Sequence, residues 1–147
     1  MKSTINSIFP TPVYLSKLDR KLTALELKFV EESKKDSHNN SGNTTSNNNY
    51  ILNEKPFINI KKELNKRVKD YFKKVLSTTD SVTPYITQSW LNYTEKNQYH
   101  HKHFHPNSLV SGIFYINCHK TLDKIKFFKE DYKIIQPEIK DWNLYNS

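Results

Sequence analysis

The spacing of the apolar residues changes at Pro84, from a helical period before it to a strand period after it. Between Phe57 and Leu76 the apolar side chains recur every three or four residues, which predicts one helix with a single buried stripe. From Tyr85 to Tyr93 polar and apolar residues alternate, which predicts a strand. Helices followed by strands predict an α+β domain, because each kind of element must bury its apolar face against another.

A first helix is predicted to begin after Thr23 and to run to about Lys35. Thr23 and Glu26 have the spacing of a capping box, in which each side chain bonds to the backbone N–H of the other residue. Residues 36–49 (DSHNNSGNTTSNNN) are polar and have no apolar anchor, so we expect a flexible loop there with an exposed His38.

Further strands are expected after a turn at residues 95–98. The segments that predict them are 99–105, 109–116, 125–128 and 134–135. No internal repeat is present. We therefore expect residues 1–147 to form a single domain, with a helical part at 1–82 and antiparallel strands at 83–147.

The composition bears on compartment and partners. The single cysteine, Cys118, excludes an internal disulfide framework and fits a reducing cytoplasm. No apolar run is long enough to span a bilayer, so no membrane partner is expected. The formal net charge is +8, and much of the excess lies in residues 61–74, where we expect a solvated helix face. Charge alone does not identify a nucleic-acid partner, and that question stays open.

Four of the six histidines lie between positions 100 and 105. On a strand, His101, His103 and His105 share one face, with residues two apart separated by about 6.5–7 Å. Their imidazoles can converge on one ion with metal–nitrogen bonds of about 2.0–2.1 Å, and neutral imidazole suits iron, zinc or copper. From spacing alone, a metal site and a cluster without a metal are equally well supported.

The segment from Gln88 to Ile116 (QSWLNYTEKNQYHHKHFHPNSLVSGIFYI) resembles the 2-oxoglutarate/Fe(II) oxygenases of bacteria and tailed phages. The shared features are a Ser-Trp strand, an H-x-H-P-x-S segment and a Ser-Gly-x-x-Tyr strand. Residues 9–13 (FPTPV) also resemble the opening of that family. The resemblance implies a double-stranded β-helix (jelly-roll) core, Fe(II) and 2-oxoglutarate as cofactors, and hydroxylation of a C–H bond in an unknown substrate.

A second resemblance, to nucleic-acid-repair oxygenases of the same superfamily, sets the register. Those enzymes place the histidine of H-x-D eleven positions after the asparagine of N-x-Y-x-x-G, as His103 follows Asn92 here. The implied metal ligands are His103 and His105, with His101 as the alternative. The implied contacts to 2-oxoglutarate are Asn92 and Thr94, with Tyr99 and Ser111 as further candidates.

The chain departs from that pattern at three points. His105 stands where Asp or Glu is usual, Asn97 replaces the turn glycine, and the distal histidine and co-substrate arginine have no counterpart. We therefore expect a jelly roll that is incomplete at its C-terminal end, which a partner chain or a second copy would complete. The alternatives are a catalytically inactive remnant that acts as a binding or accessory module, and a cupin-like metal-binding protein.

Overall fold

The computed structural model describes residues 11–128 and Lys140. The chain divides into two compact units, Met1–His103 and Phe104–Ser147, and each is described by itself. In the first unit, the segment that follows the second helix returns to pair with residues before that helix. The strand predicted at 134–135 and residues 9–10 lie outside the described residues.

Helix α1 (Ala24–Lys34) begins at the predicted capping box. The Thr23 hydroxyl accepts a hydrogen bond from the Glu26 N–H at 3.2 Å, and the Glu26 carboxylate accepts one from the Thr23 N–H at 2.7 Å. The same carboxylate receives two bonds from the Arg20 guanidinium, at 2.6 and 2.8 Å. Glu26 is 2% exposed, and these bonds, led by those from Arg20, lower its pKa to about 2.

The predicted helix at 57–76 is confirmed as α2 (Ile58–Tyr71), which continues into a π-helical turn, η3 (Phe72–Leu76). Two 3₁₀ turns precede it, η1 (Ile51–Asn53) and η2 (Lys55–Phe57). The Phe29 ring of α1 meets the Phe57 ring edge-on, with centroids 4.9 Å apart. The members of the predicted stripe are all buried or half-buried: Phe57, Ile60, Leu64, Val68, Tyr71, Phe72 and Val75.

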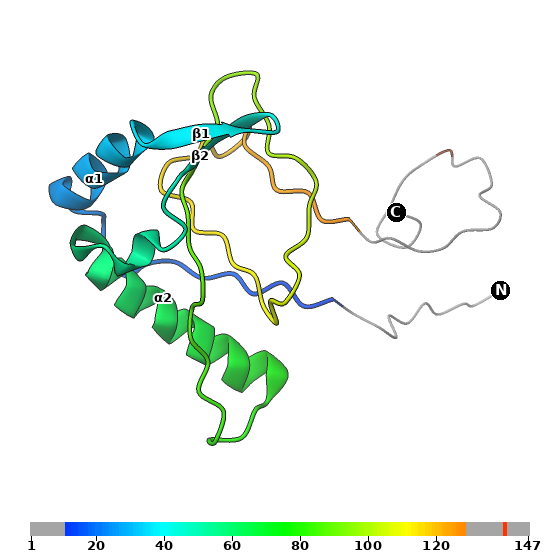
Figure 1. Ribbon diagram of the computed structural model, residues 1–147. Coiled ribbons are helices and arrows are strands. Elements are labelled where there is room, and N and C mark those ends of the chain that lie inside the picture. The colour runs from blue at the N-terminus through cyan, green and yellow to red at the C-terminus, as the bar shows by residue number, and fades with distance from the viewer. Residues whose placement is uncertain (1–10, 129–139, 141–147) are drawn as a thin grey trace. The chain divides into compact units, whose positions relative to one another are not determined.

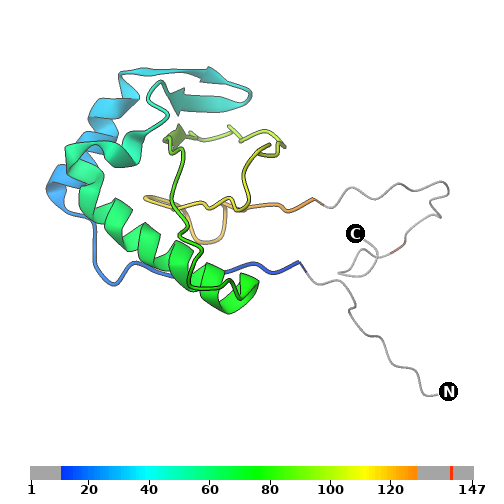
Figure 2. The ribbon, with the colours of Figure 1, turned by 60° about the horizontal axis from the view of Figure 1, so that its bottom comes forward.

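Residues 36–49 contain a β-hairpin, which corrects the prediction of a flexible loop. The strands are β1 (Ser37–Asn40) and β2 (Asn43–Ser46), and the hairpin continues from the end of α1 (Figure 1; Figure 2). The two-residue turn between them contains Gly42, whose φ of +92° suits glycine. His38, on β1, is exposed as predicted.

Two buried polar residues of β2, Thr45 and Ser46, bond to the backbone of Leu91. The Thr45 hydroxyl donates to the Leu91 carbonyl at 3.2 Å, and the Ser46 hydroxyl accepts from the Leu91 N–H at 3.0 Å. The Ser46 N–H donates to the same carbonyl at 2.9 Å. Leu91 itself is buried, at 8% exposed.

A third strand, β3 (Asn92–Tyr93), pairs antiparallel with β2 and completes a sheet of order β1-β2-β3. The predicted strand at 85–93 therefore forms only at its end. Helices and this small antiparallel sheet agree with the α+β prediction. No described helix has the length and apolar character needed to cross a membrane.

The strands predicted at 99–105, 109–116 and 125–128 are not formed in the described residues. A strand needs a partner for its backbone N–H and C=O groups, and no neighbouring strand pairs with these segments in the described part of the chain. Phe104 and Leu109 accordingly remain 84% and 80% exposed. The described residues thus form no jelly roll.

Glu26→Gln is expected to lower the free energy of unfolding by about 2–3 kcal/mol at pH 7, because Arg20 loses its charged partner. Since folding lowers the pKa of Glu26, its stabilisation is complete above the unfolded-state value of about 4.3 and is lost as the pH falls toward 2. Urea unfolding of both proteins from pH 7 to pH 2 should therefore show a difference that shrinks below about pH 4.

The control is Glu32→Gln, on the same helix. The Glu32 side chain is 55% exposed and lies 3.6 Å from the Lys28 ammonium, so its loss should change the free energy of unfolding by less than about 0.5 kcal/mol. Equal losses for the two variants would contradict the special role of Glu26.

Candidate metal site

One face of the sheet carries Asn92 and Thr94, which are predicted to contact 2-oxoglutarate. Thr45 pairs with Asn92 across β2 and β3, so their side chains share a face. Side chains two residues apart on a strand also share a face, which adds Asn43 and Thr94. The Asn43 amide donates to the Thr94 hydroxyl at 3.2 Å, in agreement with this arrangement.

The opposite face of β3 is held by α1. The Tyr93 hydroxyl donates to the Val30 carbonyl at 2.9 Å, and burial raises the pKa of Tyr93 to about 12. The Lys34 ammonium lies 5.8 Å from the centre of the Tyr93 ring and pairs with Glu95. That pairing raises the pKa of Lys34 and lowers the pKa of Glu95. The end of β3 is thus fixed to the helix, which leaves the other face for a site.

The hairpin turn holds the start of the histidine segment (residues 100–105). The Tyr99 N–H donates to the Gly42 carbonyl at 3.1 Å. A Cβ atom at Gly42 would lie 2.4 Å from the Tyr99 carbonyl oxygen and 2.9 Å from its ring. Only a residue without a side chain therefore lets Tyr99 lie against the turn. Tyr99 is 63% exposed, and its predicted contact with 2-oxoglutarate stays a prediction.

His100, His101 and His103 form a three-histidine cluster. One ring nitrogen from each lies within 4.8 Å of the others, and the ring centroids are 4.6 to 5.1 Å apart. On a strand His100 would point away from its neighbours. The segment is not a strand, so the cluster includes a residue that the alternation had placed on the opposite face.

Hydrogen bonds orient the members of the cluster. The Nδ1–H of His103 donates to the His101 carbonyl, at 2.8 Å. The Asn43 amide lies 2.9 Å from Nδ1 of His100. The buried Nδ1 of His101 has no hydrogen-bond partner among the described residues. The cluster therefore combines two oriented imidazoles with one whose buried nitrogen lacks a partner.

His105 belongs to the second unit, and its pairing with His103 stays a prediction. Within that unit Nδ1 of His105 lies 2.8 Å from the Ser111 hydroxyl. Ser111, predicted to contact 2-oxoglutarate, thus contacts one of the two predicted metal ligands. A serine that holds one ring nitrogen leaves the other ring nitrogen directed elsewhere, as metal-ligating histidines require.

The position of Asn43 beside His100 and Thr94 was not predicted, because residues 36–49 were expected to form a loop. A signal was present in Ser41-Gly42, a dipeptide that marks turns, followed by the β-branched pair Thr44-Thr45. The Asn-rich composition around these residues outweighed that signal.

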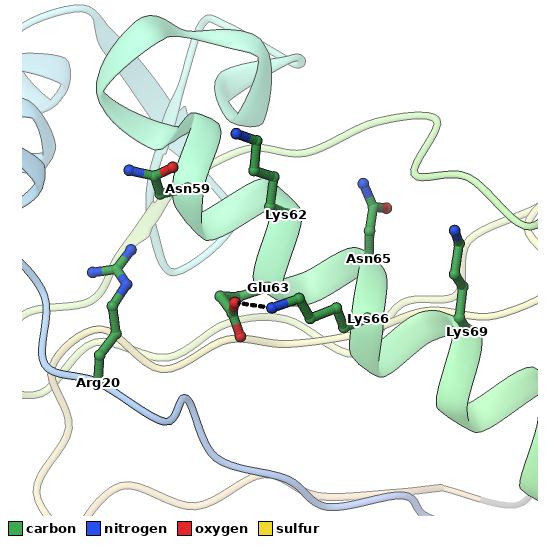
Figure 3. A pocket seen from close by; sticks show the side chains of 7 residues that line it. All are labelled: Arg20, Asn59, Lys62, Glu63, Asn65, Lys66 and Lys69. Atoms are coloured by element: carbon green, nitrogen blue, oxygen red, sulfur yellow. Dashed lines mark hydrogen bonds and ion pairs between the residues drawn. The ribbon is translucent and has the colours of Figure 1, made fainter.

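A separate hollow of about 500 Å³ lies along α2 (Figure 3). It is lined by Arg20, Asn59, Lys62, Glu63, Asn65, Lys66 and Lys69. The three lysines are exposed to solvent, in agreement with the solvated basic face predicted for residues 61–74. Lys66 is also bonded to Glu63, at 2.6 Å. No histidine or cysteine is among the described residues that line this hollow.

Both arginines of the chain are engaged with carboxylates. Arg20 binds Glu26, while Arg67 binds Asp19 at 2.7 Å and Glu63 at 2.8 Å. Each arginine has its pKa raised by these partners. Both guanidinium groups are therefore paired with carboxylates of the chain itself.

Residues 88–143 match the family model described as "Putative 2OG-Fe(II) oxygenase". The match covers less than half of the chain and includes the whole histidine segment with Asn92, Thr94, Tyr99 and Ser111. That family implies Fe(II) and 2-oxoglutarate as cofactors. Comparisons with curated proteins and with solved structures gave no significant match.

Gly42→Ala is expected to lower the free energy of unfolding by about 1–3 kcal/mol, because alanine strains the positive φ and its Cβ meets Tyr99. Chemical denaturation measures this loss, and NMR signals of the histidine rings should shift with it.

Gly112→Ala is the matched control. A Cβ atom at Gly112 meets nothing within 4 Å, so the expected change in the free energy of unfolding is below about 0.5 kcal/mol. A Gly42→Ala protein with unchanged stability and unchanged histidine signals would show that the turn does not hold the segment.

Proposed function

We propose that this protein is an Fe(II)/2-oxoglutarate-dependent oxygenase that hydroxylates a substrate still to be identified. The observation that carries the proposal is the family match over residues 88–143, which contains the four crowded histidines. When bound, iron and 2-oxoglutarate would supply hydroxylation with O₂ as the oxidant: one oxygen atom enters the C–H bond, and the other is taken up as 2-oxoglutarate is decarboxylated to succinate and CO₂. The donor set suits the metal, since neutral imidazole is a good iron ligand and a buried nitrogen of His101 lacks a partner among the described residues.

The proposed metal ligands are His103 and His105, with His101 as the alternative to His105. This assignment rests on the register with Asn92 and on the orientation of both rings. Each ring has its Nδ1 in a hydrogen bond, to the His101 carbonyl in His103 and to the Ser111 hydroxyl in His105. The His101 carbonyl can only accept, so a neutral His103 ring presents its Nε2 lone pair to a metal ion, and His105 does the same in the tautomer whose Nδ1–H donates to Ser111.

Asn92 and Thr94 are the proposed contacts to 2-oxoglutarate. Both are exposed and extend from the sheet face that also carries Asn43, whose amide lies beside His100. An amide and a hydroxyl supply hydrogen-bond donors for a carboxylate. Tyr99 and Ser111 are weaker candidates for contacts to 2-oxoglutarate, since each already contacts another part of its own unit.

A cupin-like metal-binding protein without 2-oxoglutarate is the second candidate. The engagement of both arginines with carboxylates favours it, because in this arrangement neither of them binds the far carboxylate of the co-substrate. We also propose a cytoplasmic location for the protein, and a partner chain or second copy that completes a jelly roll.

Anaerobic addition of Fe(II) and 2-oxoglutarate to the purified protein is expected to produce a visible metal-to-ligand charge-transfer band. His103→Ala and His105→Ala should abolish the band, because each removes a ligand. His119→Ala should retain it, since Nδ1 of His119 contacts Thr121 and Leu122 in its own exposed turn. Iron binding without the band would favour the cupin-like protein, and neither iron binding nor a band in folded protein would favour the inactive remnant.

Asn92→Ala is expected to weaken the affinity for 2-oxoglutarate by about tenfold, the loss of one hydrogen bond to a charged group. The affinity for Fe(II) alone should change less than about threefold, because Asn92 is not a proposed ligand. Titration of the charge-transfer band with 2-oxoglutarate measures the first quantity, and calorimetry with Fe(II) measures the second. Equal losses in both would place Asn92 outside the co-substrate site.

A further inference from the structure

We propose that His100, His101 and His103 form a three-imidazole site for a divalent transition metal ion. The site is built entirely within the first unit and needs neither His105 nor 2-oxoglutarate. It differs from the H-x-H register by including His100. The inference shares His103 with the proposed function but rests on the geometry of the first unit, so either can fail without the other.

The distances allow the three rings to converge. Their ligand nitrogens lie within 4.8 Å of one another. Two nitrogens bound tetrahedrally to one ion, each at about 2.0–2.1 Å, are about 3.4 Å apart. The rings must therefore close by about 1 Å. Rotation about side-chain bonds supplies that movement, because His100 and His103 are exposed and the segment belongs to no helix or strand.

His101 gives the strongest indication of a ligand. Its Nδ1 is buried and has no partner among the described residues, although burial of a polar nitrogen without a hydrogen bond costs about 1–3 kcal/mol. A metal ion shared with the neighbouring rings would give this nitrogen a partner. Coordination of the ion would thus offset the free-energy cost of burying the Nδ1 atom of His101.

His103 is oriented for the same purpose. Its Nδ1–H donates to the His101 carbonyl, which can only accept. In the neutral ring the lone pair is then on Nε2. The bond also ties the His103 ring to the backbone of His101, a second member of the cluster.

His100 is oriented by Asn43, which reaches it from β2. The amide lies 2.9 Å from Nδ1 of His100, and the amide oxygen is buried with no partner in the described part of the chain. Rotation of the amide by half a turn would bring that oxygen to the ring, and Nδ1–H would then donate to it. Nε2 of His100 would carry the lone pair, and the Thr94 hydroxyl, now 3.2 Å from the amide nitrogen, could donate to the same oxygen.

Three neutral imidazoles make a site that suits Zn²⁺, Co²⁺ or Ni²⁺ and leaves a fourth position for water or another ligand. The cluster contains no carboxylate among the described residues. The bound ion therefore keeps its full positive charge, which is the condition under which a metal ion acidifies water or attracts an anionic ligand.

Co²⁺ is the probe, because its visible absorption reports the number and kind of its ligands. The full chain, purified without a polyhistidine tag, should bind one Co²⁺ in the absence of 2-oxoglutarate. His100→Ala and His101→Ala should each weaken the affinity at least tenfold. His38→Ala and His119→Ala should change it less than threefold, because His38 lies exposed on the hairpin and donates to Asn47, and Nδ1 of His119 contacts Thr121 and Leu122 in its own turn.

Asn43 is tested as a positioning residue. Asn43→Asp keeps an oxygen for Nδ1–H of His100 and should retain the affinity for Co²⁺, whereas Asn43→Leu removes it and should weaken the affinity about tenfold. Circular dichroism of each variant shows whether it is folded.

Two results would overturn the inference. A loss of Co²⁺ binding in His105→Ala with none in His100→Ala would assign the metal to the H-x-H register, and the proposed function would stand. The second result is a folded protein that fails to bind Co²⁺ yet shows a charge-transfer band when Fe(II) and 2-oxoglutarate are both added. That result would exclude the three-imidazole site, and the proposed function would stand.

Discussion

The pairing of β2 with the backbone around Leu91 is the interaction on which the first unit depends. It joins the hairpin before α2 to the chain after α2, so the helix is enclosed between two segments that meet. Ser89 extends the same contact: its N–H donates to the Asn49 carbonyl and its carbonyl accepts from the Ile51 N–H, both at 2.9 Å. Without this pairing β3 has no partner and β2 keeps only β1, so the histidine segment is held to the sheet only through the contacts of Gly42 with Tyr99 and of Asn43 with His100.

The two helices were predictable because their signals are local. A capping box needs only Thr23 and Glu26 at the right spacing, and a buried stripe needs only apolar residues at a helical period. The sheet was not predictable in the same way. Its strands are short, its central strand is polar, and its stability comes from hydroxyl and backbone bonds to Leu91, about 45 residues away along the chain. A prediction from composition alone therefore assigns such a strand to a loop.

The candidate site shows the same division between local and non-local information. The crowding of four histidines was visible in the sequence, as was the resemblance that led to His103 and His105. Which histidines converge was not visible, because alternation along a strand holds only where the strand has a partner. The orientation of His100 by Asn43 depends on a contact between residues 57 apart, and no pattern within either segment contains it.

The contact between the hairpin turn and Tyr99 has a consequence for how this protein can vary. Residues 36–49 have the composition of a linker, and linkers usually accept insertions and deletions. Here one added residue in β2 would turn Asn43 to the other face of the sheet, and one added residue in the turn would move Gly42 away from Tyr99. We therefore expect the length of this segment to be more constrained than its composition, so that relatives differ in its asparagines and serines but keep its spacing.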